Sequence, residues 1–311
     1  MPDPERKTIS STQAAALYNA SPYTTPWMLY HYLRGDGIEQ TQSDRMYWGL
    51  KMQPLVLERA AADLKLEVTP NAGDRYIHDD VLGYTADAKI WHPDKGHGTL
   101  ESKCVYDYST WMRDWDGGKR VPRWYELQMQ TQLTVGDGAE PFRWGMFAVW
   151  CCGEMHYFER ELNPMVAKDL HDQAVTMLAR VHNGDEPDPF GSAIELPLLD
   201  KLLPIAKGKT LDLRESPGGK SFAELGKMLT GFRADANFNQ KAAEDARNRL
   251  RAMAGDNETV LLPYGVTLKL STRNMKEHVR KASTWTNIDV KICDTEDGAD
   301  TEDLPLGTAA V

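Results

Sequence analysis

Apolar positions recur with helical spacing in some stretches of the first 185 residues and alternate with polar positions in others. Clusters of Pro, Gly and Asp separate these stretches and mark turns. The helical pattern predicts helices at residues 11–19, 26–34, 44–64, 108–115, 122–134 and 164–183, the third of them interrupted near Pro54. The alternating pattern predicts strands at residues 66–70, 75–78, 82–91, 99–106, 143–151 and 154–162. The mixture predicts an α/β core.

The pattern changes in the segment 183–192, which is rich in Pro, Gly and acidic residues and indicates a boundary. Beyond it we expect a loop-rich stretch to residue 219, a charged helix around 221–254, a hairpin at 259–271 and a polar helix near 273–281. The chain is therefore divided into a core domain at 1–185, a basic accessory region at 186–293 and an acidic, disordered tail at 294–311.

The first predicted hairpin carries the residues with the clearest chemistry. If its turn is centred near residue 95, Asp87 lies opposite residues 102–103. Glu101 is then a diagonal neighbour of Asp87, and it shares one face of its strand with Lys103 because side chains alternate. Two carboxylates and an ammonium group are expected to converge there.

This grouping fits a Mg²⁺ site, because Mg²⁺ is usually held by one or two carboxylates plus a substrate phosphate. Asp87 and Glu101 would supply the carboxylates, and the backbone carbonyl of Ser102 a third oxygen. Lys103 would stabilise the negative charge that develops during phosphodiester cleavage. The alternative is an ordinary solvated ion pair between Glu101 and Lys103. The residues of the next predicted helix help to decide between the two interpretations.

The stretch VPRWYELQMQTQL (121–133) is typical of a helix with Pro122 in its first turn. Tyr125, Gln128 and Gln132 fall on one face of this helix. An apolar stripe would be expected there if the helix only packed against a core. The polar face favours a role beside the carboxylates.

Several stretches, in this order, resemble the lambda-exonuclease-type branch of the PD-(D/E)xK nucleases, the phage viral recombinase family of alkaline exonucleases. They are ISSTQAAALYNASPYTTPWMLY (9–30), YWGLKMQPLVLERA (47–60), YTADAKI (84–90), LESKC (100–104) and VPRWYELQMQTQL (121–133), within about residues 6–185. The resemblance implies a restriction-endonuclease-like α/β (α+β) core, with a central mixed sheet flanked by helices and a C-terminal helical and hairpin appendage.

The resemblance also implies roles for single residues. Asp87 and Glu101 would be metal ligands, Lys103 the catalytic lysine, and Tyr125 and Gln128 the supporting Y-x-x-Q element. The implied cofactor is Mg²⁺, with Mn²⁺ as a substitute.

A second implied site binds the DNA, with its terminal 5′ phosphate. The candidates near the start of the chain are Arg6, Thr12, Ser21 and Thr85, where Arg6 is the nearest cation to the position of the family's pocket arginine, occupied here by Glu5. The stretch GGKRVPR (117–123) adds Lys119, Arg120 and Arg123 as further phosphate contacts.

One position departs from the family pattern. Relatives usually carry a Glu four residues after the glycine of the stretch 47–60, whereas here Gln53 follows Gly49. An amide offers an oxygen without a charge, so a second Mg²⁺ would be held more weakly. A natural variant and an engineered substitution both fit this pattern.

The charge is segregated along the chain, although its formal net value is −10. Residues 1–200 hold 19 basic and 30 acidic residues, whereas residues 201–281 hold 16 basic and 9 acidic residues. An acidic core suits metal binding, and a basic region suits either duplex phosphates or a solvated helix face.

Cysteine spacing and hydropathy indicate the compartment. The four cysteines show no C-x-x-C spacing, and adjacent Cys151 and Cys152 on one strand would not both point at one centre, so we exclude an iron–sulfur cluster. No apolar stretch suits a signal segment or a membrane span, which predicts the cytoplasm of a bacterial host for a phage or prophage protein.

The leading hypothesis is a Mg²⁺-dependent 5′→3′ exonuclease that acts on linear duplex DNA and leaves 3′ overhangs for recombination. The resemblance implies a ring-shaped homotrimer and a single-strand annealing protein as partner. One alternative is a DNA endonuclease of the same superfamily. The other, motivated by Gln53, is a weakly active or non-catalytic DNA-binding scaffold.

Overall fold

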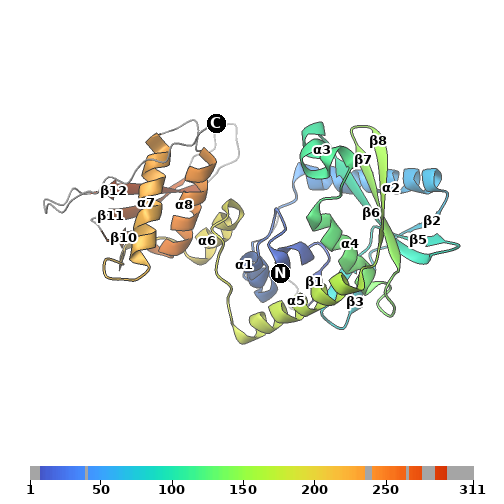
Figure 1. The fold of residues 1–311 in the computed structure, drawn as a ribbon, viewed down its shortest axis with the longest axis horizontal. Helices are drawn as coiled ribbons and strands as arrows, with labels where there is room; N and C mark the ends of the chain where they lie inside the picture. The colour runs from blue at the N-terminus through green and yellow to red at the C-terminus, as the bar shows by residue number, and fades with distance from the viewer. Residues whose placement is uncertain (1–7, 39–40, 235–239, 264–265, 275–283, 293–311) are drawn as a thin grey trace. The chain divides into compact units, whose positions relative to one another are not determined.

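The computed structural model describes residues 8–38, 41–234, 240–263, 266–274 and 284–292. The chain divides into two compact units, Met1–Phe190 and Gly191–Val311, each with its own sheet and core (Figure 1). Arg6 and the predicted tail at 294–311 lie outside the described residues. Within the described residues, no helix has the length and apolar character needed to cross a bilayer.

A five-stranded mixed sheet forms the centre of the N-terminal unit, in the order β2-β5-β6-β7-β8. Neighbouring strands are antiparallel except β6 and β7, which run parallel. A parallel pair needs a long crossover, and α3 and α4 supply it here. The strands are β2 (Glu67–Pro70), β5 (Ala88–His92), β6 (Gly96–Val105), β7 (Trp144–Cys151) and β8 (Glu154–Glu161).

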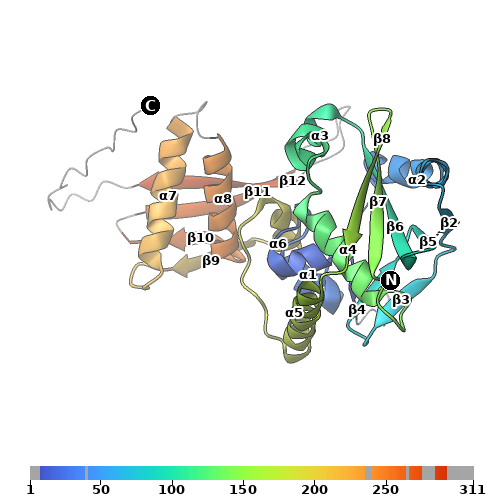
Figure 2. The same ribbon diagram turned by 45° about the vertical axis from the view of Figure 1, so that its right-hand side comes forward.

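Helices cover both faces of this sheet, because β7 sends alternate apolar side chains to each side (Figure 2). Met146 and Ala148 pack with α2 (Asp44–Leu64). Phe147 and Val149 pack with α3 (Tyr108–Trp115) and α4 (Arg123–Val135). The predicted mixed sheet flanked by helices is confirmed.

A three-stranded sheet, in the order β1-β4-β3, lies beside this core. Its strands are β1 (Ile9–Ser10), β4 (Leu82–Thr85) and β3 (Arg75–His78). The helical elements that pack around it are η1 (Ala14–Tyr18), α1 (Pro26–Arg34), α4 and α5 (Pro164–Asn183). The helix predicted at 11–19 is in fact the shorter 3-10 helix η1.

The strand predicted at 82–91 is wrong as a single element. It breaks at Ala86 and Asp87, so that β4 joins the small sheet while β5 joins the large one. The predicted interruption of α2 is also wrong, because the helix runs through Pro54. The carbonyl that loses its partner there belongs to Leu50, an exposed residue, so water can satisfy it.

The C-terminal unit is a four-stranded sheet packed against two helices around its own apolar core. Its elements are η3 (Ala193–Glu195), α6 (Leu196–Leu202), β9 (Ala206–Asp212), α7 (Gly219–Ala234), α8 (Gln240–Ala254), β10 (Asn257–Leu261), β11 (Val266–Asn274) and β12 (Thr284–Ile292). The strand order is β12-β11-β10-β9.

Parts of the expectation for this unit are corrected. The predicted hairpin at 259–271 is confirmed by the antiparallel pairing of β10 and β11. The predicted loop-rich stretch contains α6 and β9, and the predicted charged helix is the pair α7 and α8. The polar helix predicted near 273–281 is wrong at residues 273–274, which belong to β11, and otherwise lies outside the described residues.

Candidate active site

Glu101 is buried on β6, with its side chain turned toward α4 and only 5% exposed. Its Oε1 accepts hydrogen bonds from Nζ of Lys103 at 2.6 Å and from Nε2 of Gln128 at 2.7 Å. Its Oε2 accepts a hydrogen bond from Nε2 of Gln132 at 2.7 Å. The structure thus brings Glu101, Lys103 and the polar face of α4 together.

Asp87 lies in the bend between β4 and β5. Its Oδ2 accepts two hydrogen bonds from Ser102, one from the backbone N–H at 2.8 Å and one from the hydroxyl at 2.7 Å. The pairing of Ala88 with Leu100 brings Asp87 level with Glu101. The predicted diagonal relation is therefore wrong, because the turn is centred one residue earlier than expected.

The charges at the site do not balance. Burial, followed by the nearby charge of Glu101, raises the pKa of Asp87 to about 6. Burial disfavours the Lys103 ammonium, but Glu101, Tyr125 and Asp87 together raise the pKa of Lys103 above its ordinary value. Two carboxylates face one ammonium group, so the site favours a further cation.

Tyr125 positions Lys103 from α4. The Nζ of Lys103 lies 4.6 Å from the centroid of the Tyr125 ring, a cation–π distance. The ring packs in turn against Trp115 and Phe147. The hydrophobic core therefore holds the aromatic face under the ammonium group.

Gln53 shares a cavity with Asp87. This cavity of about 360 Å³ lies between α2 and β2. Its lining residues are Leu50, Gln53, Pro54, Leu57, Glu58, Ala61, Val68, Pro70, Asn71 and Asp87. The departure from the family pattern thus lies beside one of the predicted metal ligands.

A hard divalent cation fits these residues better than zinc does. Among the described residues, no group of three or more His, Cys, Asp or Glu side chains is placed to hold a metal. Asp87 and Gln53 line one cavity, and Glu101 lies level with Asp87 on the neighbouring strand. Mg²⁺ takes few protein oxygens and keeps water or phosphate for the rest. The uncompensated negative charge also suits a divalent cation.

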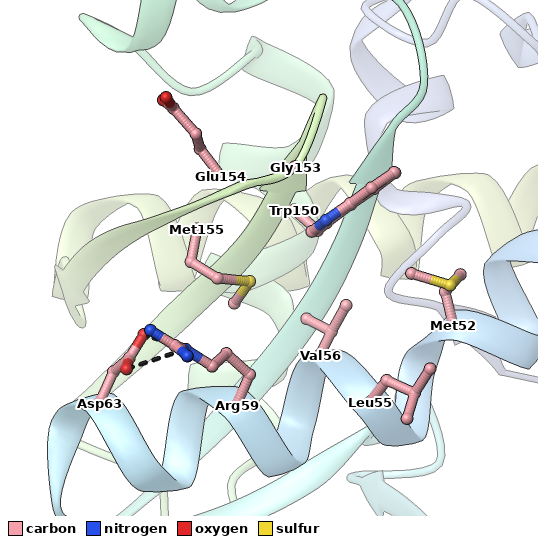
Figure 3. A pocket seen from close by; sticks show the side chains of 9 residues that line it. All are labelled: Met52, Leu55, Val56, Arg59, Asp63, Trp150, Gly153, Glu154 and Met155. Carbon is pink, nitrogen blue, oxygen red and sulfur yellow. Dashed lines mark hydrogen bonds and ion pairs between the residues drawn. The ribbon is translucent and has the colours of Figure 1, made fainter.

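A larger cavity, of about 610 Å³, lies between α2 and the β7–β8 hairpin and holds none of the predicted site residues (Figure 3). Its apolar lining includes Met52, Trp150 and Met155. The charged pair beside them, Arg59 and Asp63, is an ion pair at 2.9 Å. The candidate chemistry therefore lies at the smaller cavity.

The two hydroxyls predicted for the terminal phosphate lie on neighbouring segments. Ser10 of β1 pairs with Gly83 of β4, and Thr12 and Thr85 each follow two residues later. Both threonines are exposed, and Oγ1 of Thr12 lies 3.0 Å from Oγ of Ser10. The hydroxyls of Thr12 and Thr85 are therefore both accessible to a phosphate in solution.

The other predicted DNA contacts differ in their surroundings. The Oγ of Ser21 accepts hydrogen bonds from the backbone N–H groups of Tyr23 and Thr24, so Ser21 also stabilises its own loop. The cationic candidates near α4 are all exposed: Lys119, Arg120 and Arg123. Arg120 also donates to the backbone carbonyl of Arg113, at 3.4 Å.

Some basic residues of the C-terminal unit form ion pairs within it. Arg251 is 1% exposed and contacts Asp200 at 2.8 Å. Arg214 contacts Asp212 at 2.6 Å. For these two cations the structural interpretation is favoured over a role in phosphate binding.

Sequence reasoning missed two interactions at the site. Gln132 was placed on the polar face of α4 but given no role, and its signal was the position one helical turn beyond Gln128. Ser102 was considered only as a carbonyl ligand, whereas it is also a double hydrogen-bond donor to Asp87. Its carbonyl role stays a prediction.

Comparisons with known proteins add an independent finding. No curated protein sequence matches the chain. An alkaline exonuclease from Laribacter hongkongensis is 17% identical, with 58% of this chain and 90% of that chain covered and a TM-score of 0.47. A phage-related exonuclease from Haemophilus somnus 129PT is 9% identical, with 57% and 94% covered and a TM-score of 0.45.

Residues 4–139 match the model of the YqaJ-like viral recombinase domain. The match includes the bend at Asp87, the pair Glu101 and Lys103, and all of α4. The predicted resemblance to a viral recombinase family is confirmed. Residues 4–139 of this chain are therefore similar to the YqaJ-like viral recombinase domain.

Proposed function

We propose that this chain is a Mg²⁺-dependent DNA exonuclease that degrades one strand of linear duplex DNA from the 5′ end. It leaves 3′ overhangs for phage-type recombination, and Mn²⁺ substitutes for Mg²⁺. The coarser conclusion, a DNA nuclease, follows from the viral recombinase family together with the geometry of the carboxylates and the lysine.

The observation that carries the proposal is the convergence of Asp87, Glu101 and Lys103 beside the polar face of α4. A solvated ion pair would not require two buried glutamines to hold its carboxylate. Buried polar groups cost free energy unless they are satisfied, so this arrangement favours function over simple packing.

Each residue has a chemical role in the proposed cleavage. Ser102 holds the Asp87 carboxylate in one orientation before the substrate arrives. Lys103 stays charged at neutral pH, because its neighbours raise its pKa, and it stabilises the charge that develops on the phosphate. When bound by Asp87 and Glu101, a divalent cation supplies further charge stabilisation and lowers the pKa of the attacking water.

The 5′→3′ polarity is proposed to come from the exposed hydroxyls of Thr12 and Thr85. Arg6, which lies outside the described residues, is the cation that we propose for the same phosphate. Contacts with a terminal 5′ phosphate place the scissile bond at a fixed distance from the chain end. The exposed cations Lys119, Arg120 and Arg123 contribute sequence-independent phosphate contacts.

The assembly and partners follow from the resemblance. We propose a ring-shaped homotrimer that encloses the duplex and passes its overhang to a single-strand annealing protein in the cytoplasm of a bacterial host. Light scattering of the purified chain tests the trimer, and a mass of one or two chains contradicts it.

Three duplex substrates test the proposal: linear DNA with 5′ phosphates, the same DNA with 5′ hydroxyls, and a covalently closed circle. We expect rapid Mg²⁺-dependent loss of the first, slower loss of the second and an intact circle. Cutting of the circle would instead establish an endonuclease. Binding without cleavage in either Mg²⁺ or Mn²⁺ would establish the scaffold.

A further inference from the structure

The three-stranded sheet β1-β4-β3 has one apolar face. Ile9 of β1 lies in register with Leu82 of β4, and both are fully buried in the core of the N-terminal unit. Tyr84 of β4, also fully buried, pairs with Tyr76 of β3 on the same side. Because side chains alternate along a strand, the residues between these positions point away from that core.

The opposite face of the same sheet is polar. Ser10 of β1 lies there in register with Gly83 of β4. Thr85 of β4 is paired with Arg75 of β3, and Thr85 is exposed whereas Arg75 is half-buried. The hydroxyl oxygen of Ser10 lies 3.0 Å from that of Thr12. The two threonines proposed to contact the terminal phosphate therefore both lie at this polar face.

Arg75 extends across this face above Gly83. A Cβ atom at Gly83 would lie 3.0 Å from Nη2 and 3.3 Å from Cζ of Arg75, so the absence of a side chain there leaves the space that the guanidinium fills. The Nη2 atom also donates a hydrogen bond to the hydroxyl of Thr8, at 2.7 Å. Because Thr8 directly precedes β1, the guanidinium of a β3 residue reaches the strand that carries Ser10.

We propose that Arg75 binds the terminal 5′ phosphate of the DNA together with the hydroxyls of Thr12 and Thr85. The inference rests on the proposed function, because that function assigns the phosphate to the two threonines. The position of the family's pocket arginine holds Glu5 in this chain, and Arg75 supplies a guanidinium from β3 instead, in addition to Arg6. A guanidinium suits this ligand, since its planar fork of N–H donors matches two phosphate oxygens.

The position of Arg75 along the sheet also suits the proposed cleavage. Its partner Thr85 precedes Asp87 by two residues, which span at most about 7 Å of chain. A phosphate held by Arg75 and Thr85 is therefore fixed close to the bend that carries the Asp87 carboxylate. Binding energy at the end of the strand then positions the scissile bond.

Cleavage of matched linear duplexes with 5′-phosphate and 5′-hydroxyl ends tests the inference in the full chain. Arg75→Gln removes the guanidinium charge and keeps a polar side chain. We expect the preference for the phosphorylated end to fall about tenfold or more, the effect of a hydrogen bond between charged groups. The rate on the 5′-hydroxyl end should fall by a much smaller factor. Arg75→Lys, which keeps the charge without the fork, should lose less of the preference.

Arg59→Gln is the matched control, because it removes one positive charge from the same unit. Arg59 lies on α2 and pairs with Asp63 at 2.9 Å. We expect Arg59→Gln to keep the preference for the phosphorylated end. Equal losses of preference in Arg59→Gln and Arg75→Gln would show a general effect of net charge and would overturn the inference. Rates that fall equally on both ends in Arg75→Gln would show a purely structural role and would also overturn it.

An unchanged preference in folded Arg75→Gln overturns the inference while leaving the nuclease function intact. If Arg75→Gln does not fold, Thr8→Val decides, because it removes the hydroxyl that holds the guanidinium. We expect Thr8→Val to lower the preference by a smaller factor, and an unchanged preference in that variant overturns the inference. If the unaltered chain cleaves both ends at the same rate, the proposed phosphate pocket fails as well.

Discussion

Ser102 donates two hydrogen bonds to the same oxygen of Asp87, from its backbone N–H at 2.8 Å and from its hydroxyl at 2.7 Å. Asp87 lies in the bend between β4 of the small sheet and β5 of the large sheet, and the two hydrogen bonds hold its side chain against β6. The orientation of the Asp87 carboxylate thus depends on the hydroxyl and the backbone N–H of Ser102.

Ser102→Ala removes the hydroxyl donor and keeps the backbone donor. We expect kcat to fall about tenfold with DNA affinity unchanged, because a hydrogen bond to a charged group is worth about 1.5 kcal/mol or more. Steady-state cleavage at saturating Mg²⁺ measures this effect. Ser109→Ala is the control, since its hydroxyl donates a hydrogen bond to Asp107, the N-cap residue of α3, at 2.5 Å. Equal kcat values for Ser102→Ala and the unaltered chain would contradict the prediction.

Gln53→Glu tests whether residue 53 contributes to metal binding from its cavity beside Asp87. A third carboxylate would strengthen a second Mg²⁺ site. We expect a lower Mg²⁺ concentration for half-maximal cleavage, and a rate at limiting metal raised by about tenfold, or about 1.4 kcal/mol. Gln53→Leu should raise the Mg²⁺ requirement instead. If neither variant changes the Mg²⁺ titration, residue 53 lies outside the metal shell.

Thr12→Val and Thr85→Val keep the side-chain shape and remove the exposed hydroxyls. Each should reduce the preference for 5′-phosphate over 5′-hydroxyl ends by about fivefold, the effect of one hydrogen bond. Digestion of matched linear duplexes gives the rate ratio. Thr69→Val, at an exposed position on β2, should leave the ratio unchanged. An unaltered preference in both site variants would remove these threonines from the phosphate pocket.

The raised pKa of Asp87, about 6, predicts that the ionised Asp87 carboxylate lowers the free energy of unfolding of the metal-free chain. The pKa of an aspartate in the unfolded chain is near 4. A carboxyl whose pKa is higher in the folded state contributes its full stabilisation when it is protonated, at pH values below about 4. This stabilisation is lost as the pH rises through about 6. In EDTA at neutral pH, Asp87→Asn should therefore be more stable than the unaltered chain by about 1–2 kcal/mol.

Urea unfolding at several pH values checks this prediction, and the advantage of Asp87→Asn should vanish near pH 4. Asp94→Asn is the control, because that carboxylate is 89% exposed. A metal-free Asp87→Asn protein that is less stable than the unaltered chain at neutral pH would show that the Asp87 charge is well compensated.

Elements with local start signals could be predicted from the sequence. Thr25 caps α1 and Asn163 caps α5, and each is followed by a proline at the first helical position. Both helices have the bounds expected from the apolar pattern. The sharing of one strand face by Glu101 and Lys103 also follows from alternation alone.

Features that depend on tertiary contacts could not be predicted in this way. The residues around Asp87 are all compatible with a strand, and the break occurs because two sheets take the two halves. The contact of Gln132 with Glu101 exists only because α4 packs on β6. The strand β9 was missed because most of its side chains are exposed at a sheet edge, so no apolar alternation marks it.

The central claim is that Lys103, bonded to Glu101, stabilises charge during phosphodiester cleavage. The most direct measurement is the single-turnover rate of Lys103→Ala on a 5′-phosphorylated linear duplex, with DNA binding measured in parallel. Lys95→Ala is the control, because Lys95 pairs with Glu159 away from the site. We predict that Lys103→Ala binds the duplex normally but cleaves it about a hundredfold more slowly or worse. Near-normal cleavage by Lys103→Ala would contradict the account.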